Sequence, residues 1–224
     1  MISNDAEALI AYLRQFVSDS RWNRFQEVIN ERTNHIQVVL ENIYQAHNSS
    51  AVLRSCDCFG IQNVHYIEAR NSMRISHLVA RGSSTWLDVH QHDSKKISSR
   101  EILLNIKSQG YRLVATSPHA STTLEELDID QPFALVFGTE RTGISSEVKE
   151  VADTFVRIPM HGFTETFNIS VSAALCLYEL TSRLRKSNIN YHLTEGDKKR
   201  VLLNWLKHSL ENSELLIKRY LEDK

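Results

Sequence analysis

The sequence predicts an α/β domain with a parallel β-sheet and helical additions at both ends. Short runs rich in β-branched and apolar residues alternate with longer helical stretches, which is the pattern of repeated strand, helix and strand units. These runs are apolar at consecutive positions, as is typical of parallel strands that are buried on both faces. With 224 residues, of which 42% are hydrophobic, the chain is long enough to build one domain around a sizeable core.

Five strands are expected, and each is a short apolar run. They span residues 36–42, 64–69, 111–117, 133–138 and 155–160. Three helices are expected between them: one from the capping residue Asn48 to Gly60, one from Ser94 to Gly110, and one over 144–153. Asparagine and serine are common where helices begin, and glycine is common where they end.

Both ends of the chain are expected to be helical. Residues 5–17 and 20–32 each place apolar side chains on one helical stripe, and 195–224 carry leucines at the spacing of an amphipathic helix or a pair of helices. We expect these flanks to pack on the sheet domain or on a partner subunit. The predicted division is an N-terminal helical extension at 1–31, a central sheet domain at 32–186 and a C-terminal helical extension at 187–224.

Composition limits the class of protein. The chain has no run of 18 apolar residues, so no membrane span is expected. Its start lacks a basic region followed by a cleavage site, and its three cysteines, an odd number, fit a reducing compartment. We therefore expect a cytoplasmic protein. Because 26 basic residues are balanced by 27 acidic ones, a nucleic-acid partner would have to be bound by local basic patches.

Several ligand classes are disfavoured by spacing. No glycine lies closer than five residues to another, so the chain has neither the GxGxxG fingerprint of a nucleotide-dependent oxidoreductase nor a phosphate-binding P-loop. Cys56 and Cys58 are two apart on an expected helix and so point to different sides. His90 and His92 share a strand face, but no third ligand is expected nearby. We therefore expect no metal site.

Three segments that follow strands carry the polar residues of interest. They read HNSSAVLRSCDCFG at 47–60, LVFGTERTGIS at 135–145 and RIPMHGFTETFNISVSAALCLYE at 157–179. In this order and at these separations they resemble the three motifs of the SPOUT RNA 2′-O-ribose methyltransferases, in particular the TrmH branch. The resemblance extends from about Arg32 to Arg185. It implies a SPOUT-type sheet with a C-terminal trefoil knot, S-adenosylmethionine as the cofactor, and a site that is completed in a homodimer.

The resemblance also implies roles for individual residues. It assigns catalysis and substrate positioning to Asn48, Arg54, Glu140, Thr166 and Asn168, and cofactor binding to Thr116, Gly138, Ile158, Met160 and Phe167. Gly138 would let the donor approach the backbone closely. Many relatives have Ser-Leu-Asn where this chain has Thr166, Phe167 and Asn168, so the hydroxyl is kept while the apolar wall is larger.

Three of the catalytic candidates have a structural alternative. Arg54 fits the exposed face of an amphipathic helix, Glu140 fits a carboxylate near a helix N-terminus, and Asn168 fits an ordinary helix cap. A guanidinium stays protonated near neutral pH. We therefore expect Arg54 to bind the target phosphate and stabilise a developing alkoxide. The proton acceptor is left open between a phosphate oxygen, water and the arginine.

The expected function is methyl transfer to a ribose 2′-hydroxyl of tRNA, at guanosine 18 of the D-loop. The alternatives are another tRNA position or ribosomal RNA, and, from a different class, a noncatalytic RNA-binding protein. Basic residues expected to bind the RNA are Arg70, Arg74, Arg81, Lys198, Lys199 and Arg200. Such clusters are also common on solvated faces that bind nothing.

Overall fold

The computed structural model describes residues 2–68, 80, 82–139 and 141–222. The chain forms two compact units. The helical unit combines Met1–Thr33 with His192–Lys224, and the sheet unit is Asn34–Tyr191. The predicted limits at 31/32 and 186/187 stay a prediction. What the structure adds is that the two ends of the chain belong to the same unit.

The helical unit is built from two helices at each end of the chain. These are α1 (Ile2–Arg14), α2 (Asp19–Asn30), α8 (Glu195–Ser209) and α9 (Ser213–Glu222). Helix α8 packs against both α1 and α2. In its core the rings of Phe25 and Trp205 lie 5.5 Å apart, and the guanidinium of buried Arg32 lies 5.5 Å from the centre of the same indole. The expected terminal helices are confirmed, and the C-terminal stretch is a pair.

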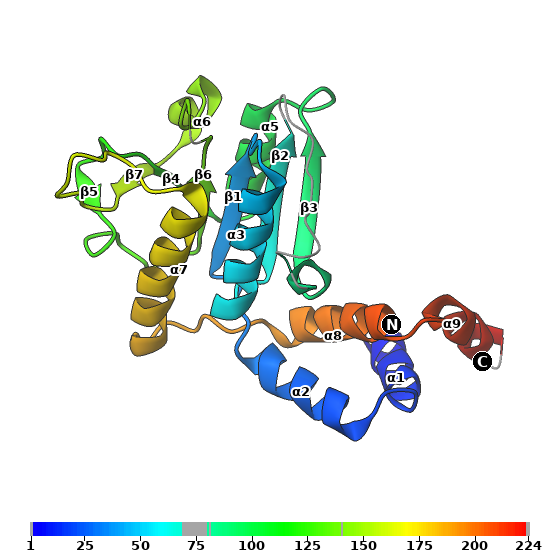
Figure 1. Ribbon diagram of the computed structural model, residues 1–224. Helices are drawn as coiled ribbons and strands as arrows, with labels where there is room; N and C mark the ends of the chain where they lie inside the picture. Colours follow the sequence, from blue (N-terminus) through cyan, green and yellow to red (C-terminus); the bar gives the residue numbers. More distant parts are fainter. Residues whose placement is uncertain (1, 69–79, 81, 140, 223–224) are drawn as a thin grey trace. The chain divides into compact units, whose positions relative to one another are not determined.

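Over its described residues the sheet unit contains a parallel sheet of seven strands (Figure 1). The sequence predicted the parallel sheet and five of these strands. Its strands are β1 (Ile36–Glu41), β2 (Asn63–Glu68), β3 (Asp88–Asp93), β4 (Arg112–Thr116), β5 (Thr122–Thr123), β6 (Phe133–Phe137) and β7 (Thr154–Arg157), in the spatial order β3-β2-β1-β6-β4-β7-β5. The five expected strands are present. Strands β3 and β5 were not among them, because β3 is polar and β5 has two residues.

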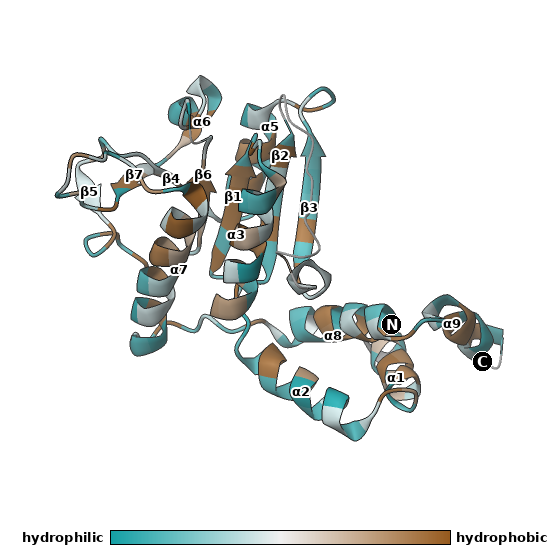
Figure 2. Cartoon of the chain, in the orientation of Figure 1, coloured by the Kyte–Doolittle hydropathy of each residue, from teal (hydrophilic) through white to brown (hydrophobic). Residues whose placement is uncertain are grey.

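Helices cover both faces of this sheet. Alternate side chains of β1 and β6 point to opposite faces: Val38 and Leu135 join one core with α3 (Ala46–Phe59) and α7 (Ile169–Lys186). Val39 and Val136 join a second core with α5 (Ser99–Ser108) and α6 (Ser146–Val151). Figure 2 shows the central strands as hydrophobic and β3 as largely hydrophilic. The consecutive apolar residues of the strands are thus explained by burial on two sides.

Three helix starts in the sheet unit differ from the sequence expectation. Helix α6, expected from residue 144, begins at Ser146 after its cap Ser145. Helix α5 begins after Ser98, not at Ser94, because Ser98 and Glu101 form a capping box in which each side chain bonds the other residue's backbone N–H. Helix α3 begins at Ala46, and Asn48 lies within its first turn. The expected ends are confirmed at Gly60, which caps α3 in the left-handed conformation at φ 80°.

Candidate active site

A cavity of about 450 Å³ lies where strands β4, β6 and β7 end. Its walls come from the segment after β4, the loop after β6, the segment after β7 and the start of α7. The lining residues are Thr116, Ser117, Pro118, His119, Phe137, Gly138, Thr139, Arg141, Thr142, Gly143, Ile144, Lys149, Val156, Arg157, Ile158, Met160, Glu165, Thr166, Phe167, Ile169, Ser172 and Cys176. This is the edge at which open parallel sheets bind their ligands.

The cavity brings together every residue that the sequence assigned to the cofactor. Thr116, Gly138, Ile158, Met160 and Phe167 all line it. Thr166, assigned to catalysis, lines it as well. The side chain of Thr116 is fixed by donating to the carbonyl of Val136, at 3.1 Å. Three segments that are distant in sequence therefore meet around one space.

Several polar residues of the wall were not among the site residues predicted from the sequence. They are Ser117, His119, Arg141, Lys149, Arg157 and Glu165. Their only sequence signal is proximity to residues of the motifs or to a strand end. That signal places a residue near the site but does not distinguish the wall from the surrounding surface.

The loop after β6 closes on its own backbone. Thr139 N–H donates to the carbonyl of Gly143 at 3.0 Å, and Gly143 N–H donates to the carbonyl of Thr139 at 2.9 Å. A Cβ atom on Gly138 would lie 2.3 Å from the Gly143 carbonyl oxygen and 2.4 Å from the backbone nitrogen of Ile144. Glycine is therefore required at 138 by the loop itself. This requirement is independent of the expected approach of a methyl donor to the backbone at Gly138.

Asn168 joins the third motif to the first. It caps α7, since its Oδ1 accepts from Ser170 N–H at 2.9 Å, which confirms the expected capping role. Its Nδ2 donates to Oδ1 of Asn48 at 3.3 Å. Asn48 is buried in the first turn of α3 and also contacts Gln45 at 3.4 Å. The starts of α3 and α7 are thus linked by one side-chain hydrogen bond.

Arg54 lies on the exposed side of α3, and it does not line the cavity. The neighbouring Leu53 is fully buried in the core, so the helix turns Arg54 toward solvent. Helix α7, which packs against α3, carries an exposed apolar stripe: Val171 is 43%, Leu175 39% and Tyr178 63% exposed. The sheet unit of one chain therefore places its arginine candidate outside the cavity.

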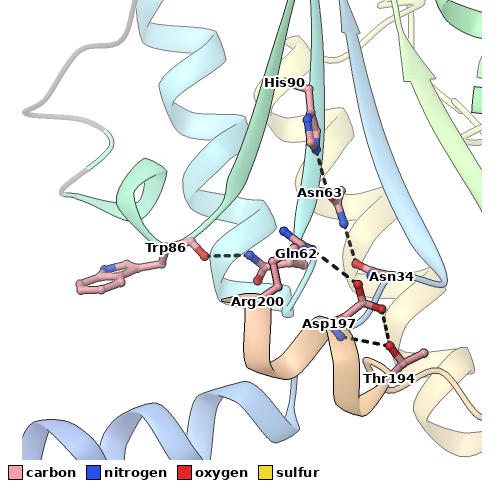
Figure 3. A network of polar contacts seen from close by, with 8 residues as sticks. All are labelled: Asn34, Gln62, Asn63, Trp86, His90, Thr194, Asp197 and Arg200. Carbon is pink, nitrogen blue, oxygen red and sulfur yellow. Dashed lines mark hydrogen bonds and ion pairs between the residues drawn. The ribbon is translucent and has the colours of Figure 1, made fainter. Parts of the chain in front are cut away.

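The predicted RNA-binding residues fall into two groups. Arg70, Arg74 and Arg81, and the catalytic candidate Glu140, lie outside the described residues. The other three belong to α8, and each has an acidic partner within the helical unit: Lys198 with Glu195 at 3.0 Å, Arg200 with Asp197 at 3.6 Å, and Lys199 with Glu7. Figure 3 shows Arg200, Asp197 and Thr194, which caps α8. These ion pairs reduce the positive charge of this patch.

A third imidazole, that of His65, accompanies His90 and His92, a neighbour that the sequence did not predict. His65 of β2 pairs in register with His90 of β3, and the two rings stack with centroids 4.7 Å apart. Nδ1 of His65 lies 3.0 Å from Nε2 of His92, and its Nε2 lies 2.9 Å from Oε1 of Gln37. Burial, with smaller contributions from His90 and His92, lowers the pKa of His65 to about 3.

A short polar chain continues from this cluster. His90 Nε2 contacts Oδ1 of Asn63 at 2.9 Å, and Asn63 donates to Asn34 at 2.6 Å (Figure 3). Both ring nitrogens of His65 and the Nε2 atoms of His90 and His92 therefore face hydrogen-bond partners of the protein. Over the described ranges no group of three or more histidine, cysteine, aspartate or glutamate side chains is arranged to hold a metal ion.

The cysteines occupy different environments. Cys56 is buried and Cys58 exposed, which confirms that the two point to different sides of α3. Cys176, on α7, lies in the cavity wall and is itself almost completely buried. Burial raises the pKa of its thiol to about 12.

The parallel sheet and the loop-lined cavity at its carboxyl end define a ligand-binding α/β protein. Residues 35–178 match the family described as SpoU rRNA Methylase family. The chain belongs to this family of RNA methyltransferases, as the three motifs predicted.

Relatives match over nearly the whole chain. A tRNA (guanosine(18)-2′-O)-methyltransferase from Borreliella burgdorferi is 38% identical over 216 residues, which cover 96% of this chain and 97% of the relative. A protein of the same name from Aquifex aeolicus is 31% identical, with 86% of this chain and 92% of the relative covered.

Solved structures confirm the fold. The structure of the Aquifex aeolicus TrmH/SpoU tRNA modifying enzyme superposes with a TM-score of 0.75 at 29% identity, covering 86% of this chain and 98% of that chain. The SpoU methyltransferase AviRb from Streptomyces viridochromogenes, in complex with the cofactor AdoMet, superposes with a TM-score of 0.60 at 21% identity, covering 72% of this chain and 65% of that chain.

Proposed function

We propose that this chain transfers a methyl group from S-adenosylmethionine to the ribose 2′-hydroxyl of guanosine 18 in tRNA. The observation that carries the proposal is the match, at 38% identity over 96% of the chain, to a relative whose name states this reaction. The cavity supports it, because the second and third motifs line one space together with the end of β4, and Asn168 of the third motif bonds Asn48 of the first.

The cavity fits the proposed cofactor. Its volume of about 450 Å³ lies within the range of about 300–1,000 Å³ that is usual for small-molecule sites. Ile158, Met160 and Phe167 provide apolar surface for an adenine ring, and Thr116 and Ser117 provide hydroxyls beside it. When bound, the cofactor supplies an electrophilic methyl group on a sulfonium sulfur.

The protein's contribution is largely one of position and charge. An acceptor hydroxyl has to lie in line with the bond that breaks, and holding it there accounts for much of a rate enhancement. Arg54 is assigned to the acceptor side, where its planar guanidinium binds a phosphate through two parallel hydrogen bonds and stabilises the developing alkoxide. Asn48 and Asn168 hold the starts of α3 and α7 together. Thr166 offers a hydroxyl in the wall, and Glu140 is assigned to the same loop as Gly138.

The active form is proposed to be a homodimer. Val171, Leu175 and Tyr178 present an exposed apolar stripe on α7, and the adjacent helix α3 carries Arg54 on its exposed side. A second copy that covered this stripe would bury it and bring an arginine toward a cavity. The fold is further proposed to be knotted. Helix α7 follows β7, near one edge of the sheet, but packs on α3, which follows the central strand β1. The chain therefore runs back from the edge toward the centre of the sheet, a return that is compatible with a C-terminal knot.

The RNA is proposed to bind through basic patches, with Lys198, Lys199 and Arg200 contributing after exchange of their acidic partners, and with Arg70, Arg74 and Arg81 as further candidates.

The protein is proposed to act in the cytoplasm. Among the described helices none is long and apolar enough to cross a bilayer.

The proposal is tested by mapping the product. The purified chain is incubated with methyl-labelled S-adenosylmethionine and an unmodified tRNA transcript, and the modified nucleotide is located by primer extension. We expect one methyl group at guanosine 18, and none when that nucleotide is 2′-deoxy. A methyl group in ribosomal RNA or at another tRNA position would identify the alternative substrate. Binding of tRNA without any transfer would support the noncatalytic alternative.

A further inference from the structure

A buried carboxylate connects the end of β1 to the loop that lines the cavity. Glu41 is the last residue of β1 and is only 4% exposed. Its Oε1 accepts from the hydroxyl of Ser145 at 2.6 Å, and its Oε2 accepts from the backbone N–H of Ser145 at 3.0 Å. The two residues are 104 positions apart in the sequence. Hydrogen bonds to a charged acceptor are stronger than those between neutral groups.

Ser145 is the point at which the cavity loop ends. It follows Gly138–Ile144, part of which lines the cavity. It is also the N-cap of α6, since its Oγ accepts from Val148 N–H at 3.2 Å. The hydroxyl therefore accepts from the helix and donates to Glu41. Both functions of the hydroxyl are used, which fixes the rotamer of Ser145 and the direction in which the loop leaves the cavity.

The other end of the connection leads into α3. Immediately after Glu41, Asn42 adopts a left-handed conformation at φ 56° and donates its N–H to the carbonyl of Ile67 at 2.8 Å. The carbonyl of Ile43 accepts from the hydroxyl of Tyr66. Helix α3, with Asn48 in its first turn, begins three residues later at Ala46. The chain is thus held firmly between Glu41 and the start of α3.

We propose that Glu41 is a positioning residue for methyl transfer: it fixes the cavity loop of the second motif relative to the helix that carries Asn48 and Arg54. This inference rests on the proposed function. Glu41 does not line the cavity, so it acts through Ser145. Nothing in the reaction requires a negative charge at this position. The geometry requires an acceptor with two oxygens, because Ser145 presents two hydrogens to it.

The isosteric amide distinguishes this role from simple packing. In Glu41→Gln one oxygen is replaced by an NH₂ group, which can donate to Ser145 but cannot accept from it. One of the two hydrogens of Ser145 then loses its acceptor while the volume stays the same. Ser145→Ala removes the hydroxyl and leaves the backbone contact. Since both changes break the same connection, their effects should not add.

The chain offers a matched control. Ser98 and Glu101 form another serine cap paired with a glutamate, at the start of α5 in the same sheet unit. Neither residue lines the cavity. Ser98→Ala and Glu101→Gln therefore make the same chemical changes at a helix start away from the site.

The experiment measures cofactor affinity by titration calorimetry, kcat and KM for transfer, and hydrogen exchange of the backbone amides of 138–145, with folding monitored by circular dichroism. We expect Glu41→Gln and Ser145→Ala each to weaken S-adenosylmethionine binding about tenfold and to accelerate exchange in 138–145. The double variant should bind S-adenosylmethionine no more weakly than the more impaired of the two single variants. The Ser98 and Glu101 variants should leave both quantities unchanged.

Two results would overturn the inference. The first is unchanged exchange in 138–145 in folded Glu41→Gln. The second is an equal loss of affinity in the Ser98 and Glu101 variants, because it would reflect general destabilisation. Failure of the proposed function gives a different result. A wild-type chain that binds no S-adenosylmethionine would refute that function, while the exchange measurement would still decide whether Glu41 holds the loop.

Discussion

The candidate site has a donor side, where the cofactor is proposed to bind, and an acceptor side, which is proposed to face the RNA. A single chain encloses the first and leaves the second open. The donor side is enclosed: strand ends, the self-closing loop at Gly138 and the segment around Phe167 surround one cavity. The acceptor side is open, with Arg54 exposed on α3 and an apolar stripe uncovered on α7. One chain thus encloses a cavity of small-molecule size, whereas the acceptor side is the part that we propose a second copy completes.

The difference also concerns the kind of interaction. Backbone contacts set the donor side, as the hydrogen bonds between Thr139 and Gly143 illustrate. The acceptor side depends on long side chains at a surface. Substitutions on the donor side should therefore change the affinity for S-adenosylmethionine, and substitutions on the acceptor side should change the rate of tRNA methylation.

The largest effect is expected from Arg54→Ala. Loss of a group that stabilises charge in the transition state costs about 10²–10³ in rate, and we expect a fall of about 10³ in kcat for tRNA methylation. Because Arg54 lies outside the cavity, the dissociation constant for S-adenosylmethionine should stay within about twofold. Arg54→Lys should also be strongly impaired, since an ammonium does not reproduce the planar fork. Arg24→Ala, at an exposed arginine of α2, is the control and should leave kcat unchanged. A large loss of S-adenosylmethionine affinity in Arg54→Ala would refute the division of roles between the two sides.

Leu175→Glu should separate the two copies. An unpaired charge buried in an interface costs several kcal/mol, so dimerisation should weaken by about 10² or more. Sedimentation at micromolar concentration should show wild type near twice 25.8 kDa and the variant near the monomer mass. Leu104→Glu introduces the same charge at an exposed leucine on α5 and should remain dimeric. A fully active wild-type monomer would contradict a site shared between copies.

Gly138→Ala tests the donor side. The added methyl group would meet the Gly143 carbonyl oxygen at 2.3 Å, so the loop would have to shift. Backbone strain of about 1–3 kcal/mol corresponds to a loss of S-adenosylmethionine affinity of about 5- to 150-fold, measured by calorimetry. At Gly162, on the segment after β7, the nearest atom to an added Cβ is 4.0 Å away, and alanine there should be tolerated. Equal affinities for both variants would show that the loop adapts.

His65 lies outside both sides and should affect stability alone. Burial lowers its pKa to about 3, whereas in the unfolded chain it is about 6.5. The contribution of His65 to the free energy of unfolding is therefore complete above pH 6.5 and declines as the pH falls toward 3. Between these pH values the imidazole binds a proton in the unfolded chain but not in the folded one. The free energy of unfolding should drop by about 2 kcal/mol between pH 7.5 and pH 5 on this account.

Chemical denaturation at several pH values measures that slope. His65→Gln should flatten it, and replacement of exposed His161 should not. An unchanged slope in His65→Gln would assign the pH dependence to other groups. Relative rates of methylation at pH 7.5 should be nearly equal in both variants.

The sequence predicted features that depend on local pattern. Buried parallel strands appear as apolar runs. Of the wall residues, Thr116 ends β4, Gly138 directly follows β6, and Phe167 directly precedes the cap of α7. Asn168 begins α7 as a capping residue should. In each case the signal lies within a few residues of the feature. The catalytic and RNA-binding roles assigned to side chains in these motifs stay predictions.

The remaining features depend on strand register and on distant partners. His65 meets His90 only because β2 and β3 pair in one register, and Glu41 meets Ser145 across 104 positions. The polar strand β3 gave no apolar signal. Asparagine is a residue type that often caps helices, but Asn48 lies inside the first turn of α3. Its hydrogen bond to Asn168 has no signature in the local sequence.

Cys176 illustrates how a reactive side chain is kept inert beside a methylating agent. A thiolate is a strong nucleophile, and one facing a methyl sulfonium would itself become alkylated and block the cavity wall. With a pKa of about 12, only about one thiol in 10⁵ is ionised at pH 7. On the proposed function, the burial that packs Cys176 into the core of α7 therefore also protects the enzyme from methylating itself.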